Sequence, residues 1–254
     1  MPHTLKDVLP VTARVNEVDH LEVGGCDTAE LAAEFGTPLY VFDEATFRAR
    51  AKALREAFPE ATLYFAAKAF PTTAVLQLAQ QEGYGVDVAS GGELHTALAA
   101  GIPAERLILH GNNKSDADIA RAVGAGIGRI AIDNLDDIDR VAIAADKGGR
   151  RQQVLLRVTP GVEAHTHVYI QTGQEDSKFG LSIESGLAEE AARRIAKQPS
   201  LELVGVHAHI GSNIFSYDPF GKTVQILFGF LDPLRDIAEF SELNLGGGLG
   251  IPYT

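Results

Sequence analysis

Tyr64-Phe65-Ala66-Ala67-Lys68-Ala69-Phe70 is the stretch from which the fold can be worked out. Aromatic and small apolar residues lead to one lysine, a pattern typical of a buried strand that carries a functional group to its carboxyl end. Loss of hydration at the mouth of such a strand would make the Lys68 amine a nucleophile toward an aldehyde. The alternative is an ordinary lysine whose charged end reaches solvent beyond the strand.

Outward from this stretch, short apolar runs alternate with helical patterns along the chain. This alternation predicts a parallel β-sheet covered by helices. We expect strands at residues 63–68, 85–89, 107–110, 130–133, 154–158, 204–209 and 243–245. We expect helices at residues 72–81, 91–100, 115–125, 135–146, 187–197 and 221–239.

Polar or glycine residues lie at the carboxyl ends of these strands: Lys68, Asp87, His110, Asp133, Arg157, His209 and Gly246. An open doubly wound sheet concentrates its site at one switch point, whereas a barrel uses the ends of many strands. The sequence therefore predicts an α/β fold of the (β/α)8 TIM-like barrel type. The barrel is expected to be incomplete, with its eighth strand absent because the chain stops at Thr254.

The segment before the repeat is a different unit. Residues 38–43 predict a strand outside the barrel, and an alanine-rich helix follows at 44–58. We expect two parts: an N-terminal segment at 1–43, and a barrel at 44–254 that is truncated before the eighth strand.

Composition excludes several classes of function. The chain has 254 residues, 45% of them hydrophobic and 22% charged, which is typical of a globular protein. Its net charge of −12 argues against a nucleic-acid partner. Cys26 is the one cysteine, so a disulfide framework is excluded. Neither a signal peptide nor a membrane-spanning run is visible, and we expect a cytoplasmic protein.

Two histidines alternate in Val206-His207-Ala208-His209-Ile210. Alternation on a strand puts His207 and His209 on one face, where a flat imidazole can stack on a cofactor ring. Ser212, after a tight turn, can offer a hydroxyl and an N–H to a phosphate. Two alternatives stay open: core histidines satisfied by neighbours, or a two-histidine metal site with a third ligand from His165 or His167.

Three consecutive glycines, Gly246, Gly247 and Gly248, follow the last predicted strand. Their backbone N–H groups are not screened by side chains, an arrangement that binds anions. A glycine run alone indicates no more than a tight turn. However, it comes one βα unit after the loop at 211–212, and late loops of a barrel form phosphate sites. The two loops together indicate a phosphorylated ligand.

A lysine, a stacking histidine and two phosphate loops suit pyridoxal 5'-phosphate. The lysine would hold the aldehyde as a Schiff base, the loops would anchor the phosphate, and the ring would serve as the electron sink. We therefore predict a pyridoxal-phosphate site and no metal.

Several longer motifs resemble the diaminopimelate decarboxylases, in the fold type III group of pyridoxal-phosphate enzymes. They lie at 64–69, 86–94, 110–115, 167–173, 176–180, 207–212 and 246–248, and the resemblance runs from about residue 20 to the end. The lysine, His-x-x-Ser and Gly-Gly-Gly elements are shared with ornithine and arginine decarboxylases. The Tyr-Ile-x-Thr-Gly and Ser-Lys-Phe-Gly loops are more specific to the diaminopimelate branch.

The resemblance implies a role for each site residue. Lys68 would be the Schiff-base lysine, and His209 would stack on the pyridine ring. Ser212 and the glycines at 246–248 would hold the phosphate. Asp87 and Arg157 match positions near the cofactor. For these two the alternatives are a cap for the turn after the strand and an ion-pair partner inside the barrel, respectively.

Members of the family continue where this chain stops. They have an eighth strand with a Glu-Pro-Gly-Arg motif, then a β-domain with a Cys-Glu-Ser motif. The resemblance implies that this chain is the front part of a longer protein and that the strand at 38–43 belongs to the missing β-domain. It also implies that the chain alone is catalytically weak or inactive.

The activity implied is decarboxylation of meso-2,6-diaminopimelate to L-lysine by a cytoplasmic enzyme. The full-length protein would be a homodimer with a small-molecule amino-acid substrate, and would bind neither nucleic acid nor membrane. The alternatives are a related ornithine- or arginine-type decarboxylase, a non-catalytic pyridoxal-phosphate-binding barrel, and an inactive fragment that survives as an interaction protein.

Overall fold

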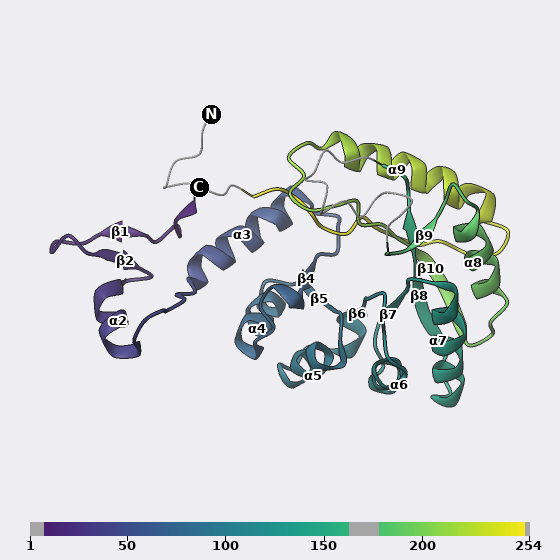
Figure 1. The fold of residues 1–254 in the computed structure, drawn as a ribbon, viewed down its shortest axis with the longest axis horizontal. Coiled ribbons are helices and arrows are strands. Elements are labelled where there is room, and N and C mark those ends of the chain that lie inside the picture. Colours follow the sequence, from purple (N-terminus) through teal and green to yellow (C-terminus); the bar gives the residue numbers. More distant parts are fainter. Residues whose placement is uncertain (1–7, 163–177, 252–254) are drawn as a thin grey trace. The chain divides into compact units, whose positions relative to one another are not determined.

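The computed structural model describes residues 8–162 and 178–251 of the chain (Figure 1). The chain forms two compact units. The smaller comprises residues 1–63, 81–84 and 252–254, and the larger comprises residues 64–80 and 85–251. The division between residues 43 and 44, drawn from the sequence, stays a prediction.

The larger unit contains a parallel sheet whose seven strands follow the order β11-β10-β8-β7-β6-β5-β4. A short extra strand, β9, pairs with β8. The strands are β4 (Tyr64–Ala66), β5 (Gly85–Val88), β6 (Leu107–Leu109), β7 (Arg129–Ile132), β8 (Gln152–Thr159), β9 (Leu181–Ser182), β10 (Leu201–His207) and β11 (Glu242–Asn244). The helices are α4 (Thr73–Gln81), α5 (Gly91–Ala99), α6 (Asp116–Ala125), α7 (Leu135–Lys147), α8 (Leu187–Ala196) and α9 (Asp218–Leu231). Short 3-10 turns are η1 (Ala67–Ala69), η2 (Ala104–Arg106) and η3 (Asp232–Leu234).

The sheet curls, and its helices lie along the outside (Figure 1). Strand β4 is at one end of the strand order and β11 at the other. This confirms the predicted α/β fold and the incomplete TIM-like barrel. The sequence missed β9, which is only two residues long.

The strands are apolar because both of their faces are buried. In β6, Leu107, Ile108 and Leu109 are all 1% exposed or less. Leu107 and Leu109 belong to the main core, which also contains residues of the outer helices. Ile108 packs with Leu155 and Val204 in a separate cluster. Alternate residues of a strand therefore serve two different cores.

Side-chain caps fix where the helices begin. Ser90 accepts a hydrogen bond at the start of α5, Ser115 forms a capping box with Asp118 at α6, and Asn134 caps α7. Helix α9 ends earlier than the sequence predicted, at Leu231 instead of residue 239. Pro233 lies two residues further on, where its ring favours a 3-10 turn over continued helix.

The smaller unit contains a three-stranded antiparallel sheet of β1 (Arg14–Val15), β2 (Leu21–Val23) and β3 (Cys26–Asp27). Two helices follow, α2 (Thr28–Phe35) and α3 (Glu44–Ala57), capped by Asp27 and Asp43. Helix α3 confirms the predicted helix at 44–58. The sheet and α2 were not predicted.

The predicted strand at 38–43 is wrong: none of these residues belongs to a strand. Leu39, Val41 and Phe42 are exposed, and Tyr40 is 99% exposed. The physical reason is that residues with β propensity form a strand only beside a neighbouring strand edge. Within the described residues, the sheet of β1 to β3 does not extend to this segment.

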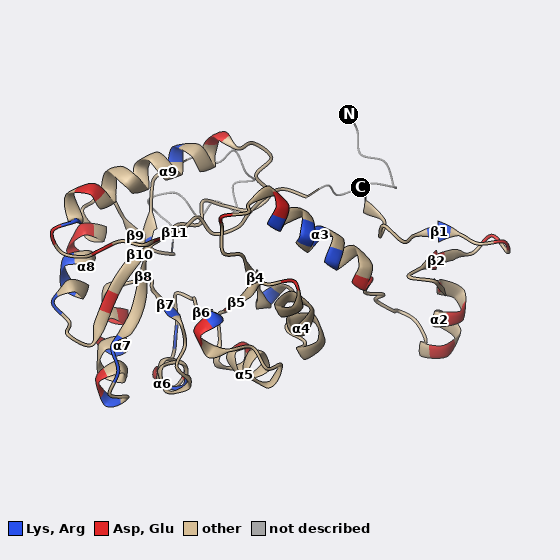
Figure 2. Cartoon of the chain, turned by 180° about the vertical axis from the view of Figure 1, so that it is seen from behind, with Lys and Arg blue, Asp and Glu red and all other residues tan. Residues whose placement is uncertain are grey.

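Charges of both signs are interspersed along α3, α7 and α8 (Figure 2). Among the described helices, none is long and apolar enough to cross a membrane.

Candidate active site

Lys68 lies immediately beyond the first strand of the curled sheet. Strand β4 ends at Ala66, two residues before the predicted end, and Lys68 is the middle residue of turn η1. The turn is anchored by Ala67, which is fully buried, and by the hydrogen bond from Phe70 N to Ala67 O, 3.0 Å. Lys68 itself is exposed, so the predicted loss of hydration is wrong for this structure. Its amine is accessible to a ligand.

Asp87 faces the loop after the neighbouring strand. It lies on β5, in register with Ala66 of β4. Its Oδ1 is 3.1 Å from Nε2 of His110, close enough for an ion pair. The contact does not have hydrogen-bond geometry, and both atoms are buried without a hydrogen-bond partner among the described residues. The two side chains therefore face each other as an ion pair between neighbouring strand ends.

His207 and His209 have different environments. Strand β10 ends at His207, so His209 follows the strand instead of belonging to it. The His207 ring is buried and meets the His110 ring edge-on, with centroids 4.6 Å apart. Burial, and then the charges of His110 and Arg157, keep the pKa of His207 well below its usual range.

His209 is half-buried among cationic groups. Burial, and then the positive charges of Arg157 and Lys68, lower the pKa of His209 to about 4, while Asp87 opposes the shift. The ring is therefore neutral at physiological pH. The same interactions show that His209 lies within electrostatic range of three predicted site residues.

Arg157 lies on β8 and is 9% exposed. Its Nη1 donates to Oδ1 of Asp133 over 3.1 Å, and its guanidinium carbon lies 4.4 Å from the centre of the Phe179 ring. Burial lowers the pKa of Arg157, and Asp133 opposes that shift. This is the ion pair of the alternative interpretation. A role beside a cofactor stays a prediction.

The two glycine loops lie side by side, as predicted. Ile214 and Leu249 form a parallel bridge, with Ile214 N donating to Gly248 O and Gly250 N donating to Ile214 O, both over 2.9 Å. The loop that contains Ser212 is thus joined directly to the glycine run. Both segments follow strands that are neighbours in the sheet, β10 and β11.

The glycine run is shaped so that side chains would not fit. Gly246 and Gly248 have φ angles of +68° and +101°, in the region that favours glycine. A Cβ at Gly246 would lie 3.0 Å from Nδ1 of His209, and a Cβ at Gly248 would collide with the carbonyl oxygen of Gly211. Gly246 and Gly247 are exposed. Backbone N–H groups beside a neutral flat ring fit the phosphate and ring of pyridoxal phosphate.

The predicted residues thus gather at one edge of the sheet, because the carboxyl ends of parallel strands share that edge. Sequence reasoning missed the partners that hold them: Phe179 under Arg157, and Asn244 beside His207. It noted His110 and Asp133 at strand ends without assigning roles. Asn244 had a visible signal, an asparagine two residues before a glycine that needs a positive φ.

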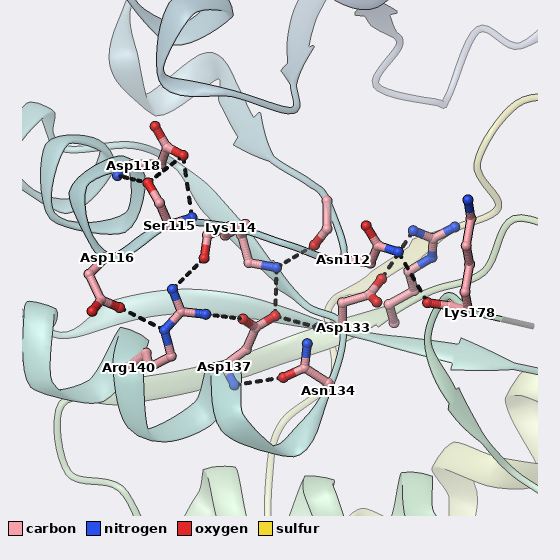
Figure 3. Close-up of polar contacts among 12 residues, drawn as sticks. Asn112, Lys114, Ser115, Asp116, Asp118, Asp133, Asn134, Asp137, Arg140 and Lys178 are labelled. Atoms are coloured by element: carbon pink, nitrogen blue, oxygen red, sulfur yellow. Dashed lines mark hydrogen bonds and ion pairs between the residues drawn. The ribbon is translucent and has the colours of Figure 1, made fainter.

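A second polar network surrounds Lys114, in the loop after β6, and Asp137, in the first turn of α7 (Figure 3). Lys114 Nζ is 2.6 Å from Asp137 Oδ2 and donates to Gly111 O over 2.6 Å. Asp137 Oδ2 also accepts from the backbone N–H of Asp133 over 3.1 Å. The network therefore ties the loop after β6 to helix α7 and to the residue that pairs with Arg157.

The metal alternative involved His165 and His167, which lie outside the described residues. Within the described part of the chain, no group of three or more histidine, cysteine, aspartate or glutamate residues could hold a metal ion.

Comparison with known proteins agrees with this site. Residues 44–254 match the model of the family described as "Pyridoxal-dependent decarboxylase, pyridoxal binding domain". The chain belongs to this family of pyridoxal-dependent decarboxylases.

Two curated relatives with high sequence identity have the same enzyme name. The chain is 49% identical to diaminopimelate decarboxylase of Bacillus subtilis over 249 residues, and 43% identical to that of Mycobacterium tuberculosis over 261 residues. These matches cover 96% and 99% of this chain, but 57% and 58% of the relatives. The chain thus spans a little over half the length of these curated relatives.

Solved structures show the same fold. Diaminopimelate decarboxylase of M. jannaschii, determined in complex with L-lysine, superimposes with a TM-score of 0.85 at 32% identity, over 96% of this chain and 58% of that one. The enzyme from Helicobacter pylori, also with L-lysine, has a TM-score of 0.77 at 29% identity and covers 84% of this chain and 55% of that one.

Proposed function

We propose that the protein containing this chain is a diaminopimelate decarboxylase, which releases CO₂ from the D-configured centre of meso-2,6-diaminopimelate and leaves L-lysine. The observation that carries the proposal is the pair of bridged glycine loops beside neutral His209, on the sheet edge that also presents Lys68. The sequence identity to diaminopimelate decarboxylases across nearly the whole chain supports this substrate.

Pyridoxal phosphate would be held by Lys68, His209, Arg157 and the two glycine loops. The exposed Lys68 amine would bind its aldehyde, and the Ser212 loop with Gly247 and Gly248 would bind its phosphate. The N–H of Gly246 is already donated to the Asn244 side chain, so Gly246 would contribute the bend of the loop. When bound, the cofactor supplies a ring that accepts the electron pair left behind by CO₂. The neutral His209 ring would pack against a flat ligand without adding charge. Arg157, whose charge is buried, would favour an anionic group in front of it.

Asp87 and His110 present an acceptor and a ring nitrogen toward each other, 3.1 Å apart. In the proposed site this pair would hold the two side chains in place beside the cofactor.

The full-length protein is proposed to act on small-molecule amino acids as a cytoplasmic homodimer. The net charge of −12 and the single cysteine support the compartment. Sedimentation of the full-length protein tests the dimer.

The decisive assay measures CO₂ and L-lysine released by the full-length protein from meso-diaminopimelate, with ornithine and arginine offered in parallel. Lys68→Ala should abolish release, and Lys197→Ala, at an exposed lysine after α8, is the matched control. Release from ornithine or arginine instead would assign the protein to a related decarboxylase. Cofactor binding without turnover of any of the three would identify a non-catalytic barrel.

A further inference from the structure

Asn244 joins the glycine run to the buried His207. It is the last residue of β11 and lies opposite His207 of β10 in the sheet register. Its side-chain Oδ1 is 3.0 Å from Nδ1 of His207 and accepts the backbone N–H of Gly246 over 2.9 Å. Its backbone carbonyl accepts the N–H of Ala208 over 2.9 Å. Asn244 therefore links the end of β10, which precedes the Ser212 loop, to the start of the glycine run after β11.

The chemistry of these contacts fixes the orientation of the carboxamide. Gly246 N–H is a donor, so the atom facing it must be the amide oxygen, because a reversed amide would set NH₂ against N–H. An amide oxygen facing His207 requires that Nδ1 of His207 carries the hydrogen. Burial keeps the His207 ring neutral, so this hydrogen occupies one defined nitrogen. His207 thus holds Asn244 in the orientation that Gly246 needs.

The bond from Gly246 N–H to the Asn244 side chain spans two residues, which is the geometry of an Asx turn. The turn leads directly into Gly246 at φ +68°, packed against His209. The Asn244 side chain therefore supports the bend of the chain at Gly246. Preorganisation of this kind reduces the cost of ordering the loop on binding.

We propose that Asn244, oriented by His207, is a positioning residue that presets the loop at 246–248 for a phosphate monoester. The proposal rests on the proposed function and deepens it, because it separates recognition of the phosphate from recognition of the ring and aldehyde. Lys68 and His209 serve the ring and aldehyde, whereas the Asn244–His207 pair serves the phosphate alone.

Two probes separate these parts: pyridoxal phosphate, and pyridoxal, which lacks the phosphate. Their dissociation constants are measured on the full-length protein and its variants. Asn244→Leu removes the acceptor and should raise the dissociation constant of pyridoxal phosphate about tenfold, which is the effect of losing well-formed hydrogen bonds. The dissociation constant of pyridoxal should change much less. Asn244→Ser keeps a shorter acceptor for the same turn and should recover part of the loss.

His207 is tested with the same probes. His207→Leu should reproduce the selective loss, and His207→Asn, which can again donate to Asn244, should restore much of it. These conservative variants keep the test open if a leucine variant fails to fold.

The outcomes are distinct. A fall in affinity confined to pyridoxal phosphate supports the proposal. Equal losses for both probes would mean a general structural role and overturn it, as would unchanged affinities in Asn244→Leu. A wild-type protein that binds pyridoxal phosphate no better than pyridoxal would overturn the phosphate site of the proposed function, and the proposal with it.

Discussion

Lys114 Nζ lies 2.6 Å from Asp137 Oδ2, and neither side chain is exposed to solvent. Lys114 also donates to Gly111 O, and Asp137 accepts from Asp133 N–H. A buried ion pair is costly to desolvate, so it is retained only where both charges are well bonded. Here the pair holds the loop between β6 and helix α6. His110 is the first residue of this loop, and its Nε2 lies 3.1 Å from Asp87 Oδ1 in the site.

We predict that Lys114→Met lowers the free energy of unfolding by up to about 3–5 kcal/mol, because it removes the nearer cation of the buried Asp137 carboxylate and leaves only Arg140, whose Nη1 lies 3.6 Å from Asp137 Oδ1. The double variant Lys114→Met/Asp137→Leu should recover part of this loss. Urea unfolding of the full-length protein measures both.

The matched control is the exposed pair Arg193–Glu189 on α8. Arg193→Met should change stability by about 1 kcal/mol or less, because exposed pairs are screened by solvent. Equal losses of unfolding free energy in Lys114→Met and Arg193→Met would show that the buried pair contributes no more to stability than the exposed pair.

Lys68 is predicted to be the residue that binds the cofactor covalently. Its amine is exposed at the sheet edge, whereas the Lys114 amine is buried in its ion pair. Borohydride treatment of the protein with pyridoxal phosphate should place a stable label on Lys68, located by peptide mass spectrometry. Label on Lys114 or Lys178 would contradict the assignment.

The two histidines should differ in what they contribute to binding. His209→Ala removes the ring that packs against Gly246 and should weaken both pyridoxal and pyridoxal phosphate. His207→Ala should weaken the phosphate form selectively, and to a smaller extent. Equal losses in the two variants, or stoichiometric zinc in the purified protein, would instead favour the two-histidine metal site.

The barrel could be predicted from the sequence because its strands are buried on both faces. Runs such as Leu107–Leu109 are then continuously apolar, and each is followed by a capped helix. The strand at 38–43 could not be judged in the same way. Its residues have β propensity, but whether a neighbouring edge exists is a property of the tertiary structure.

The features of the site also differ in whether the sequence could predict them. The two glycine loops could be paired because they belong to consecutive βα units. The contact between His207 and Asn244 could not, because it joins residues 37 positions apart through the register of β10 and β11. The position of Lys68 beyond its strand depends on the burial of Ala67, which is also set by packing.

Two glycines provide a matched test of the loop. Gly248→Ala should cost about 1–3 kcal/mol of stability, because its φ of +101° is strained for alanine and its Cβ would collide with Gly211 O. It should also weaken pyridoxal phosphate binding. Gly221, on α9, has open space around its Cβ position, so Gly221→Ala should stabilise by about 0.5–1 kcal/mol. A neutral Gly248→Ala would show that the loop adapts.

Stability should depend on pH through His207 and His209. The folded-state pKa is depressed for both rings, to about 4 for His209, whereas an unfolded histidine titrates near 6.5. Between these values the unfolded chain binds more protons, so the free energy of unfolding falls as pH drops from about 7 toward 4 and is unaffected by these groups above 7. Each extra proton adds a slope of about 1.4 kcal/mol per pH unit.

Urea unfolding at pH 5.0 and pH 7.5 measures this slope, with His209→Gln and His207→Asn as variants that cannot titrate. Each variant should flatten the pH dependence. The buried ring should give the larger effect, because His207 is shielded from water more completely than His209. A slope that persists in the double variant would mean that other groups, not these two rings, carry the acid sensitivity.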